Sequence, residues 1–320
     1  MKFDVVILGA GLGGLECGYT LSKNGYKVCV LEQNPLLGGC LQTFKRKGTS
    51  FDTGFHYIGG LAEGQHLNHL FHYFDLMSLP WKKLDETCFD EVIFNGKSYA
   101  FANGYEPFIE TLAKEFPNQK ENLKQYIATL SEIGRNIFHS FSPRDAEEFY
   151  QSKAFTQSAY DFLNETISDP TLRNVLAGTS LKMELHPGKL PLYIFAQIND
   201  SFIQSAWRIG GGGMQIAQKL AQSIEQQGGT IRTHAKVVEL IEEEGQISRA
   251  ILSNGEEIEG SYFISNLQPV GTLNLIHESK VIRNIYKRRI TNMANTYGMF
   301  TANLQLKDGE VPYLNRNIYL

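Results

Sequence analysis

Residues 5–40, VVILGAGLGGLECGYTLSKNGYKVCVLEQNPLLGGC, decide the fold of this chain. Residues 3–8 are rich in Val and Ile and predict a short buried strand, and residues 13–24 predict a helix. Gly25 follows where a left-handed helix cap is expected, and residues 26–31 predict a second strand. Two parallel strands joined by one helix form a βαβ unit with a right-handed crossover. The stretch therefore predicts the opening of an α/β domain.

The loop between this strand and helix carries three regularly spaced glycines. Gly9, Gly11 and Gly14 form the dinucleotide-binding pattern G-x-G-x-x-G. Gly9 allows a tight turn, Gly11 lets the backbone approach a pyrophosphate, and Gly14 lets the helix pack against the strand. The free N–H groups at the helix start favour a phosphate. In this context the motif predicts a dinucleotide-binding domain.

The end of the second strand predicts which dinucleotide binds. Glu32 stands 18 positions after Gly14, where an acid accepts hydrogen bonds from a ribose 2′-OH and repels the 2′-phosphate of NADP. The alternative is a solvated acid at a strand end. Gly38 and Gly39 predict a second close backbone approach, which a long flavin dinucleotide needs and a simple NAD dehydrogenase does not. An ordinary glycine turn is the alternative, but EQNPLLGGC resembles the extended FAD fingerprint of glutathione-reductase-like flavoproteins.

The remaining elements alternate between β and helical patterns. A hairpin is expected about Lys47-Gly48, and a clearer one about Asn95-Gly96, which is a strong type I′ turn signal. From residue 107 to about residue 199 the pattern is mostly helical. A glycine loop, a helix and further strands follow from residue 210. This order is typical of a nucleotide domain interrupted by an inserted domain.

We therefore expect an α/β protein, α+β overall, of 320 residues and about two domains. A Rossmann-like FAD-binding domain of the glutathione-reductase type is expected at residues 1–75 and 204–270. An inserted substrate domain of a sheet plus helices is expected at residues 76–203 and 271–320, incomplete at its C-terminal end.

Composition excludes several other classes. Apolar residues make up 42% of the chain, charged residues 20%, and the net charge is −4, so a packed core is feasible and no nucleic-acid partner is expected. The four cysteines form no C-x-x-C pair and no His cluster has zinc spacing, so we expect no metal and reduced thiols in the cytoplasm. No uncharged apolar run reaches the ~18 residues of a membrane helix, and no signal peptide is expected.

A specific resemblance begins at GGCLQTFKRKGTSFDTGFHYIGG. This segment resembles the branch of FAD oxidoreductases that contains phytoene desaturases and retinol saturases. Cys40 stands where many carotenoid desaturases have an arginine, which is more similar to the retinol saturase side. The resemblance runs from residue 1 to about residue 300. The positions that carry it are Gly38, Gly39, Thr43, Phe44, Asp52, Thr53, Gly54, His56, Tyr57, Ile58 and Gly59.

The resemblance implies a set of cofactor contacts. Residues 9–14 would hold the pyrophosphate, Glu32 the adenosine ribose and Val237 the adenine, while residues 54–57 would lie near the flavin ring. The implied FAD-binding residues are Gly9, Gly11, Leu12, Gly13, Gly14, Glu32, Gln33, Gly38, Gly39, Cys40, Gly54, Phe55, His56, Val237 and Asn266.

The resemblance also implies a reaction. It is hydride exchange between the flavin and a carbon–carbon bond of a carotenoid- or retinoid-like polyene, as reduction or as desaturation, with NAD(P) as a possible transient electron donor or acceptor. His56 and Tyr57 are weak candidates for catalysis, and the alternative is a structural hydrogen-bonding pair. An apolar small-molecule substrate and possible peripheral membrane contact are further expectations, and the oligomeric state stays open.

One departure from the family pattern affects the expected activity. Members of this branch usually run longer and end with a Gly-Asp flavin segment, whereas no Gly-Asp dipeptide occurs in this chain. We therefore expect a C-terminally truncated or split sequence. Two other possibilities stay open, an amine-oxidase-like flavoprotein and a non-catalytic FAD-binding fragment.

Overall fold

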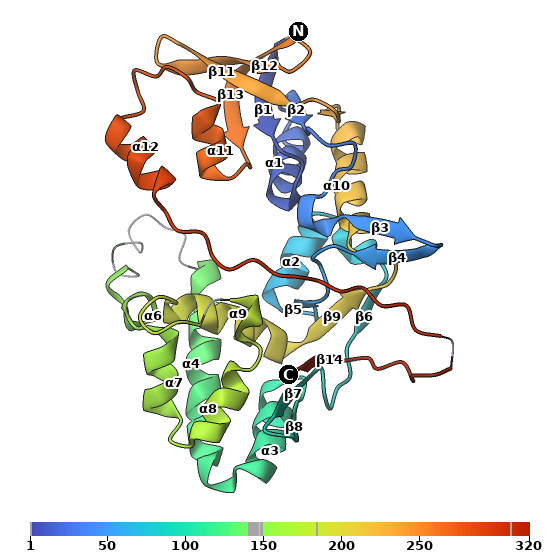
Figure 1. Ribbon diagram of the computed structural model, residues 1–320, viewed down its shortest axis with the longest axis vertical. Coiled ribbons are helices and arrows are strands. Elements are labelled where there is room, and N and C mark those ends of the chain that lie inside the picture. The colour runs from blue at the N-terminus through green and yellow to red at the C-terminus, as the bar shows by residue number, and fades with distance from the viewer. Residues whose placement is uncertain (1, 140–146, 148–149, 184, 308) are drawn as a thin grey trace. The chain divides into compact units, whose positions relative to one another are not determined.

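The computed structural model describes residues 2–139, 147, 150–183, 185–307 and 309–320. The chain divides into two compact units (Figure 1), and the domain ranges expected from the sequence stay a prediction. Unit 1 comprises Met1–His56, His72–Pro80 and Ile209–Gln305. Unit 2 comprises Tyr57–Phe71, Trp81–Arg208 and Leu306–Leu320.

Unit 1 is built on a six-stranded sheet in the order β10-β2-β1-β13-β12-β11. The first four strands of that order are parallel, and β12 is antiparallel to both of its neighbours. The elements of this unit are β1 (Phe3–Leu8), α1 (Leu12–Lys23), β2 (Val28–Leu31), the 3-10 turn η1 (Gly39–Leu41), β3 (Thr43–Arg46), β4 (Thr49–Asp52), η2 (Leu76–Ser78), α10 (Met214–Gln226), β10 (Thr230–Arg232), β11 (Val237–Glu243), β12 (Gln246–Leu252), β13 (Glu257–Ser265), α11 (Pro269–Asn274) and α12 (Asn284–Thr291).

Both faces of the central strands are covered. Val6 and Leu8 of β1 join a buried cluster with Leu31 and with Ile276, which follows α11. Helices α1 and α10 lie side by side next to β1 and β2 (Figure 1). This double burial explains the near-continuous apolar run of residues 3–8, which is typical of parallel strands.

Unit 2 combines helices with two small sheets. One sheet has the order β14-β7-β8, with β14 parallel to β7, and the other has the order β5-β9-β6. Elements α2 and β9 lie mostly in this unit. Its elements are β5 (Ile58–Gly59), α2 (His66–Tyr73), β6 (Trp81–Lys83), β7 (Asp90–Phe94), β8 (Lys97–Phe101), α3 (Tyr105–Glu115), η3 (Pro117–Gln119), α4 (Lys120–His139), α6 (Lys153–Thr156), α7 (Ala159–Thr166), α8 (Pro170–Ala177), η4 (Ser180–Lys182), α9 (Leu192–Gln204), β9 (Ala206–Ile209) and β14 (Asn317–Tyr319).

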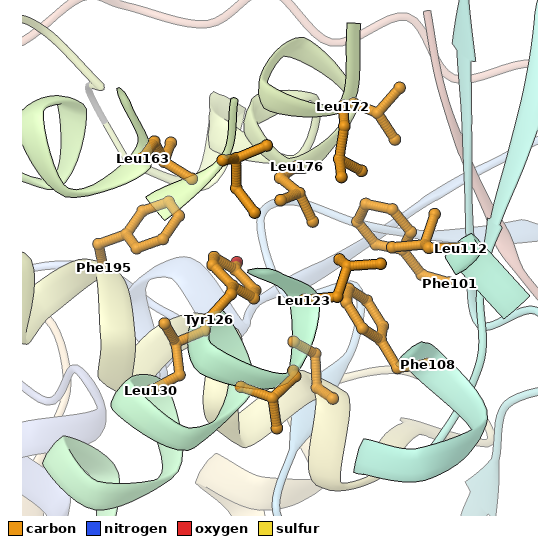
Figure 2. Close-up of a cluster of buried hydrophobic side chains, with 14 of the residues drawn as sticks. Phe101, Phe108, Leu112, Leu123, Tyr126, Leu130, Leu163, Leu172, Leu176 and Phe195 are labelled. Atoms are coloured by element: carbon orange, nitrogen blue, oxygen red, sulfur yellow. The ribbon is translucent and has the colours of Figure 1, made fainter. Parts of the chain in front are cut away.

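The core of unit 2 lies among its helices. Figure 2 shows Tyr126 of α4 between Leu123 and Leu130 of the same helix, with Phe108 of α3 and Phe195 of α9 in the same buried cluster. Residues one helical turn apart on α4 therefore point into one core, as the helical period requires.

The predicted local elements are largely confirmed. Strand β1 spans the predicted residues, but β2 begins at Val28 rather than at residue 26. The cause is the helix end, where the Tyr26 N–H donates to Leu21 O and Gly25 has φ +84°, so that Tyr26 closes α1. Both expected hairpins form, and Asn95 and Gly96 have the positive φ that a type I′ turn requires.

A short strand follows the first hairpin. Ile58 and Gly59 form β5. They pair with Trp207 and Ala206 of β9. That partner lies about 150 residues away, so no local pattern marks the strand. Among the helices of the described residues, none is both long and apolar enough to cross a bilayer.

Candidate functional site

The turn after β1 needs two of its glycines for geometric reasons. Gly9 has φ +93°, and its N–H donates to Leu31 O at 2.8 Å. A Cβ added to Gly14 would collide with the Gly9 carbonyl oxygen. Gly14 is therefore a position of close approach between α1 and the turn after β1, as predicted from the motif.

Helix α1 starts with unused donors. Gly11 is its N-cap, no side chain caps the helix, and no acid stands in its first turn. The N–H groups at the start of an α-helix have no partner within the helix and lie at the positive end of its dipole. The turn that begins at Leu12 and Gly13 can therefore bind a phosphate group.

The second glycine pair packs against the first motif. Gly38 pairs with Gly11 as a parallel bridge, and its N–H donates to Ala10 O at 2.7 Å. A Cβ at Gly38 would lie 2.9 Å from Ala217 Cβ of α10, and one at Gly39 would lie 3.4 Å from Gly11 Cα. The backbone segments that the sequence singled out are thus brought together, with no side chain between them.

Glu32 is buried and hydrogen-bonded, so it is not a solvated strand-end acid. It is 8% exposed. One oxygen accepts from the Ala10 N–H at 3.0 Å, and the other accepts from the N–H and the side-chain amide of Asn34, both at 2.9 Å. The acid therefore ties the glycine turn to the end of β2. Its contact with a ribose stays a prediction, as does that of its exposed neighbour Gln33.

Residues 232–235, which are far from Glu32 in the sequence, contact its backbone. The Glu32 N–H donates to Arg232 O, and the Ala235 N–H donates to Glu32 O, both at 2.8 Å. Val237 begins β11 two residues later. Val237, which is expected to contact the adenine, therefore lies two residues beyond a backbone segment that is hydrogen-bonded to Glu32.

Asn266 lies over the start of α1. Its N–H donates to Leu8 O at 2.9 Å. Its side-chain nitrogen would lie 3.1 Å from a Cβ at Gly11, and its side-chain oxygen 2.9 Å from a Cβ at Gly13. An amide here can donate to a phosphate oxygen, and it would have to shift if position 13 carried a Cβ.

The glycine loop before α10 is held by Asp52. The Gly213 N–H donates to Asp52 Oδ1 at 2.9 Å. A Cβ at Gly213 would lie 3.0 Å from Phe55, and one at Gly54 would lie 3.6 Å from Cys40 Cβ. Cys40 and Gly54, two positions expected near the flavin, are therefore neighbours, and Phe55, a third, lies against the glycine loop. Asp52 is not among the predicted FAD-binding residues, although it belongs to the segment that carries the family resemblance.

His56 and Tyr57 have different surroundings. His56 is exposed, whereas Tyr57 in unit 2 donates to Asp90 Oδ2 at 2.8 Å and lies 2.6 Å from the Tyr319 hydroxyl. Burial raises the pKa of Tyr57 far above its usual value, and Asp90 raises it further. Tyr57 thus keeps its proton at neutral pH. A catalytic role for either residue stays a prediction.

Asp90 has further partners that were not predicted from the sequence. Lys182 Nζ lies 3.2 Å from Asp90 Oδ2, and Asn317 Nδ2 donates to Asp90 Oδ1 at 2.8 Å. Burial lowers the pKa of Lys182, and Asp90 raises it in part. These residues come from separate parts of the chain, and none of them stands in a motif.

The residues of unit 1 fit an FAD. Glycines leave backbone exposed where a Cβ would intrude, a helix start offers N–H groups for a pyrophosphate, and a buried acid stands at the end of β2. Leu12, Gly13 and Asn266 would hold the phosphates, and residues 38–40 would line the chain of the flavin.

Comparisons with known proteins agree with this arrangement. A family model described as flavin containing amine oxidoreductase matches residues 12–294. The chain is 29% identical over 279 residues to the all-trans-retinol 13,14-reductase of Danio rerio, covering 80% of this chain and 45% of that protein. It is 26% identical over 288 residues to the chloroplastic prolycopene isomerase of Daucus carota, covering 83% of this chain and 46% of that protein. The predicted resemblance is confirmed, and the chain spans about half the length of the curated relatives it matches.

The fold is shared with solved structures. The crystal structure of an oxidoreductase from Methanosarcina mazei matches with a TM-score of 0.65 at 21% identity, covering 91% of this chain and 65% of that chain. The predicted fold class, an α/β fold with a Rossmann-like sheet, is confirmed.

Proposed function

Because the chain belongs to the flavin-containing amine oxidoreductase family, we propose that the protein is an FAD-dependent oxidoreductase that acts on a carbon–carbon bond of a carotenoid- or retinoid-like polyene. When bound, FAD supplies the hydride transfer. The residues of unit 1 bind and orient the dinucleotide through backbone N–H groups and one acid.

The observation that carries this proposal is the junction of the two glycine segments. Gly11 and Gly38 pair side by side at the uncapped start of α1. One segment suits the pyrophosphate, and the next suits the extended run of a flavin dinucleotide. Glu32 disfavours a 2′-phosphate beside it because two like charges repel strongly at short range.

The names of two related proteins support the proposal of a polyene substrate. Two proteins similar to this chain are named all-trans-retinol 13,14-reductase and prolycopene isomerase. We extend the proposal to an apolar small-molecule substrate, NAD(P) as a transient electron donor or acceptor, and peripheral membrane contact. Cosedimentation with liposomes tests the last point, and protein that stays in the supernatant contradicts it.

Flavin binding is tested with the 320-residue chain and FAD. We expect a yellow complex after gel filtration, and we expect Gly14→Ala to lose it because the new Cβ collides with the Gly9 carbonyl. Gly271→Ala is the matched control, since a Cβ at Gly271 meets nothing within 4 Å. A colourless wild-type protein that folds but takes up no FAD would overturn the proposal.

Amine oxidation is a second candidate, because the matching family model is described as one of amine oxidoreductases. The two candidates are separated by anaerobic loss of flavin absorbance. Bleaching by a dihydro-polyene, or reoxidation of reduced flavin by the polyene, supports the first. Bleaching by amines alone supports the second.

A further inference from the structure

We propose that a pocket inside unit 2 receives the polar end of an apolar ligand, and that Gln204 and Asp200 make it select a neutral hydroxyl end over a carboxylate. The choice of a polyene as the apolar body rests on the proposed function. The selection of the end group rests on the pocket alone.

The pocket is small and mostly apolar. It has a volume of about 280 Å³ and is lined by β5 and its neighbours, α2, α4 and α9, with Ile58, Leu67, Ile198 and Phe202 among its apolar side chains. Ligand pockets usually measure ~300–1,000 Å³ and carry a few placed polar groups in an apolar wall. The volume therefore suits one end of a long molecule.

Asp200 of α9 is the buried acid of this pocket. It is 2% exposed. Its Oδ1 accepts from the Tyr105 hydroxyl at 2.7 Å, and its Oδ2 accepts from Gln204 Nε2 at 2.6 Å. Burial raises the pKa of Asp200, while these two hydrogen bonds and Arg135 lower it in part. Among the described residues, its two hydrogen-bond partners are neutral, and Arg135 is a cation that acts on it.

Two glycines allow α9 to pack closely against its neighbours. A Cβ at Gly134 of α4 would collide with Asp200 Oδ2, and a Cβ at Gly59 of β5 would collide with Ser201 of α9. Helix α9 is therefore packed tightly between α4 and β5. The Asp200 carboxylate lies directly against the backbone of α4 at Gly134.

This acid fixes the orientation of the Gln204 amide. A carboxylate only accepts hydrogen bonds, so the NH₂ end of Gln204 must face Asp200. The amide also forms a side-chain hydrogen bond with Tyr105, which leaves its oxygen as the acceptor for a ligand. Gln204 is half-buried and lines the pocket. A free amide oxygen suits a hydroxyl group, which can donate to it, and not a carboxylate, which can only accept.

The same arrangement disfavours an anionic ligand. A carboxylate end would enter an apolar pocket beside a buried negative charge, and like charges in such surroundings repel strongly. The Gln204 oxygen is an acceptor and not a donor, so it does not offset this repulsion. An uncharged alcohol end is not repelled by the Asp200 carboxylate.

The test measures binding of all-trans-retinol and all-trans-retinoic acid to the full chain at pH 8 by quenching of Trp fluorescence. We expect the wild type to bind the alcohol at least about tenfold more tightly than the acid. Asp200→Asn should bind the acid about tenfold better with little change for the alcohol, because it removes the charge and keeps the side-chain shape. Gln204→Leu should weaken the alcohol.

Two controls make the result specific. Glu132→Gln removes an exposed charge from α4 and should leave the preference unchanged. Leu67→Trp fills the pocket and should weaken both ligands, whereas Leu70→Trp, at a position on the same helix that is 39% exposed, should not. Equal binding of alcohol and acid by the wild type, or an unchanged preference in Asp200→Asn, would overturn the proposal. Neither readout needs bound flavin, so a failure of FAD binding is seen separately.

Discussion

At the scale of single residues, the buried ion pair of unit 2 is sensitive to substitution. Asp90 is fully buried, and Lys182 Nζ is its cationic partner. The same Nζ lies 4.1 Å from the centre of the Phe202 ring and 4.8 Å from that of Tyr57. A buried charge that loses its partner destabilises a fold far more than an exposed one does.

We predict that Lys182→Met lowers the free energy of unfolding by about 3 kcal/mol, because it leaves Asp90 buried without a cation. Part of the loss is offset, since burial already lowers the pKa of Lys182 and so disfavours its charged form in the fold. Urea denaturation followed by Trp fluorescence measures the change, because Trp81 and Trp207, the two tryptophans of the chain, lie in unit 2.

The control for this prediction is the double variant Asp90→Asn with Lys182→Met. Removing both charges should cost clearly less than the sum of the two single substitutions. Strictly additive losses would contradict a coupled pair.

At the scale of elements, the contact between α1 and α10 depends on one small residue. A Cβ at Gly18 of α1 would lie 2.9 Å from Ile224 Cδ1 of α10 and 3.2 Å from Val30 Cγ2 of β2. Helices that approach this closely leave no room for a larger side chain at the crossing.

We predict that Gly18→Leu destabilises unit 1 by ~1–3 kcal/mol through overpacking. Ile224→Ala opens space at the same contact, so the double variant should be more stable than the sum of the two losses predicts. Thermal denaturation followed by circular dichroism measures all three. A Gly18→Leu variant as stable as the wild type would show that α10 moves aside without cost.

At the scale of the whole molecule, each unit has its own hydrophobic core. Val6, Leu31 and Leu252 belong to the core of unit 1, while Tyr126 and Phe195 belong to that of unit 2. Units with separate cores can unfold separately. The predicted FAD contacts lie in unit 1, whereas both tryptophans lie in unit 2.

We therefore predict that FAD stabilises one of two unfolding transitions. At a concentration about 100-fold above its dissociation constant, a ligand stabilises the unit that binds it by ~2.7 kcal/mol. The transition that releases flavin should rise in temperature with the FAD concentration, while the one seen by Trp fluorescence should stay. A common shift of both signals would mean that the units unfold together.

The sequence by itself determined the parts of this protein whose physics is local. The strand, glycine turn and helix of residues 3–23, and the hairpin turn at Asn95-Gly96, follow from side-chain period and from backbone angles that glycine and asparagine adopt easily. The glycine pattern and Glu32 likewise predicted the fold class, because they lie within one continuous strand–helix–strand unit of the sequence.

Only the tertiary structure decided which distant residues share a site. The hydroxyls of Tyr57 and Tyr319 meet although 262 positions separate them, and Tyr105 reaches Asp200 across 95. The sequence held one overlooked sign, since Asn199 and Asp200 fall on the buried side of α9 between Phe195 and Ile203. Their partners could not be predicted, because a hydrogen bond between distant segments depends on how the chain packs and leaves no periodic trace in the sequence.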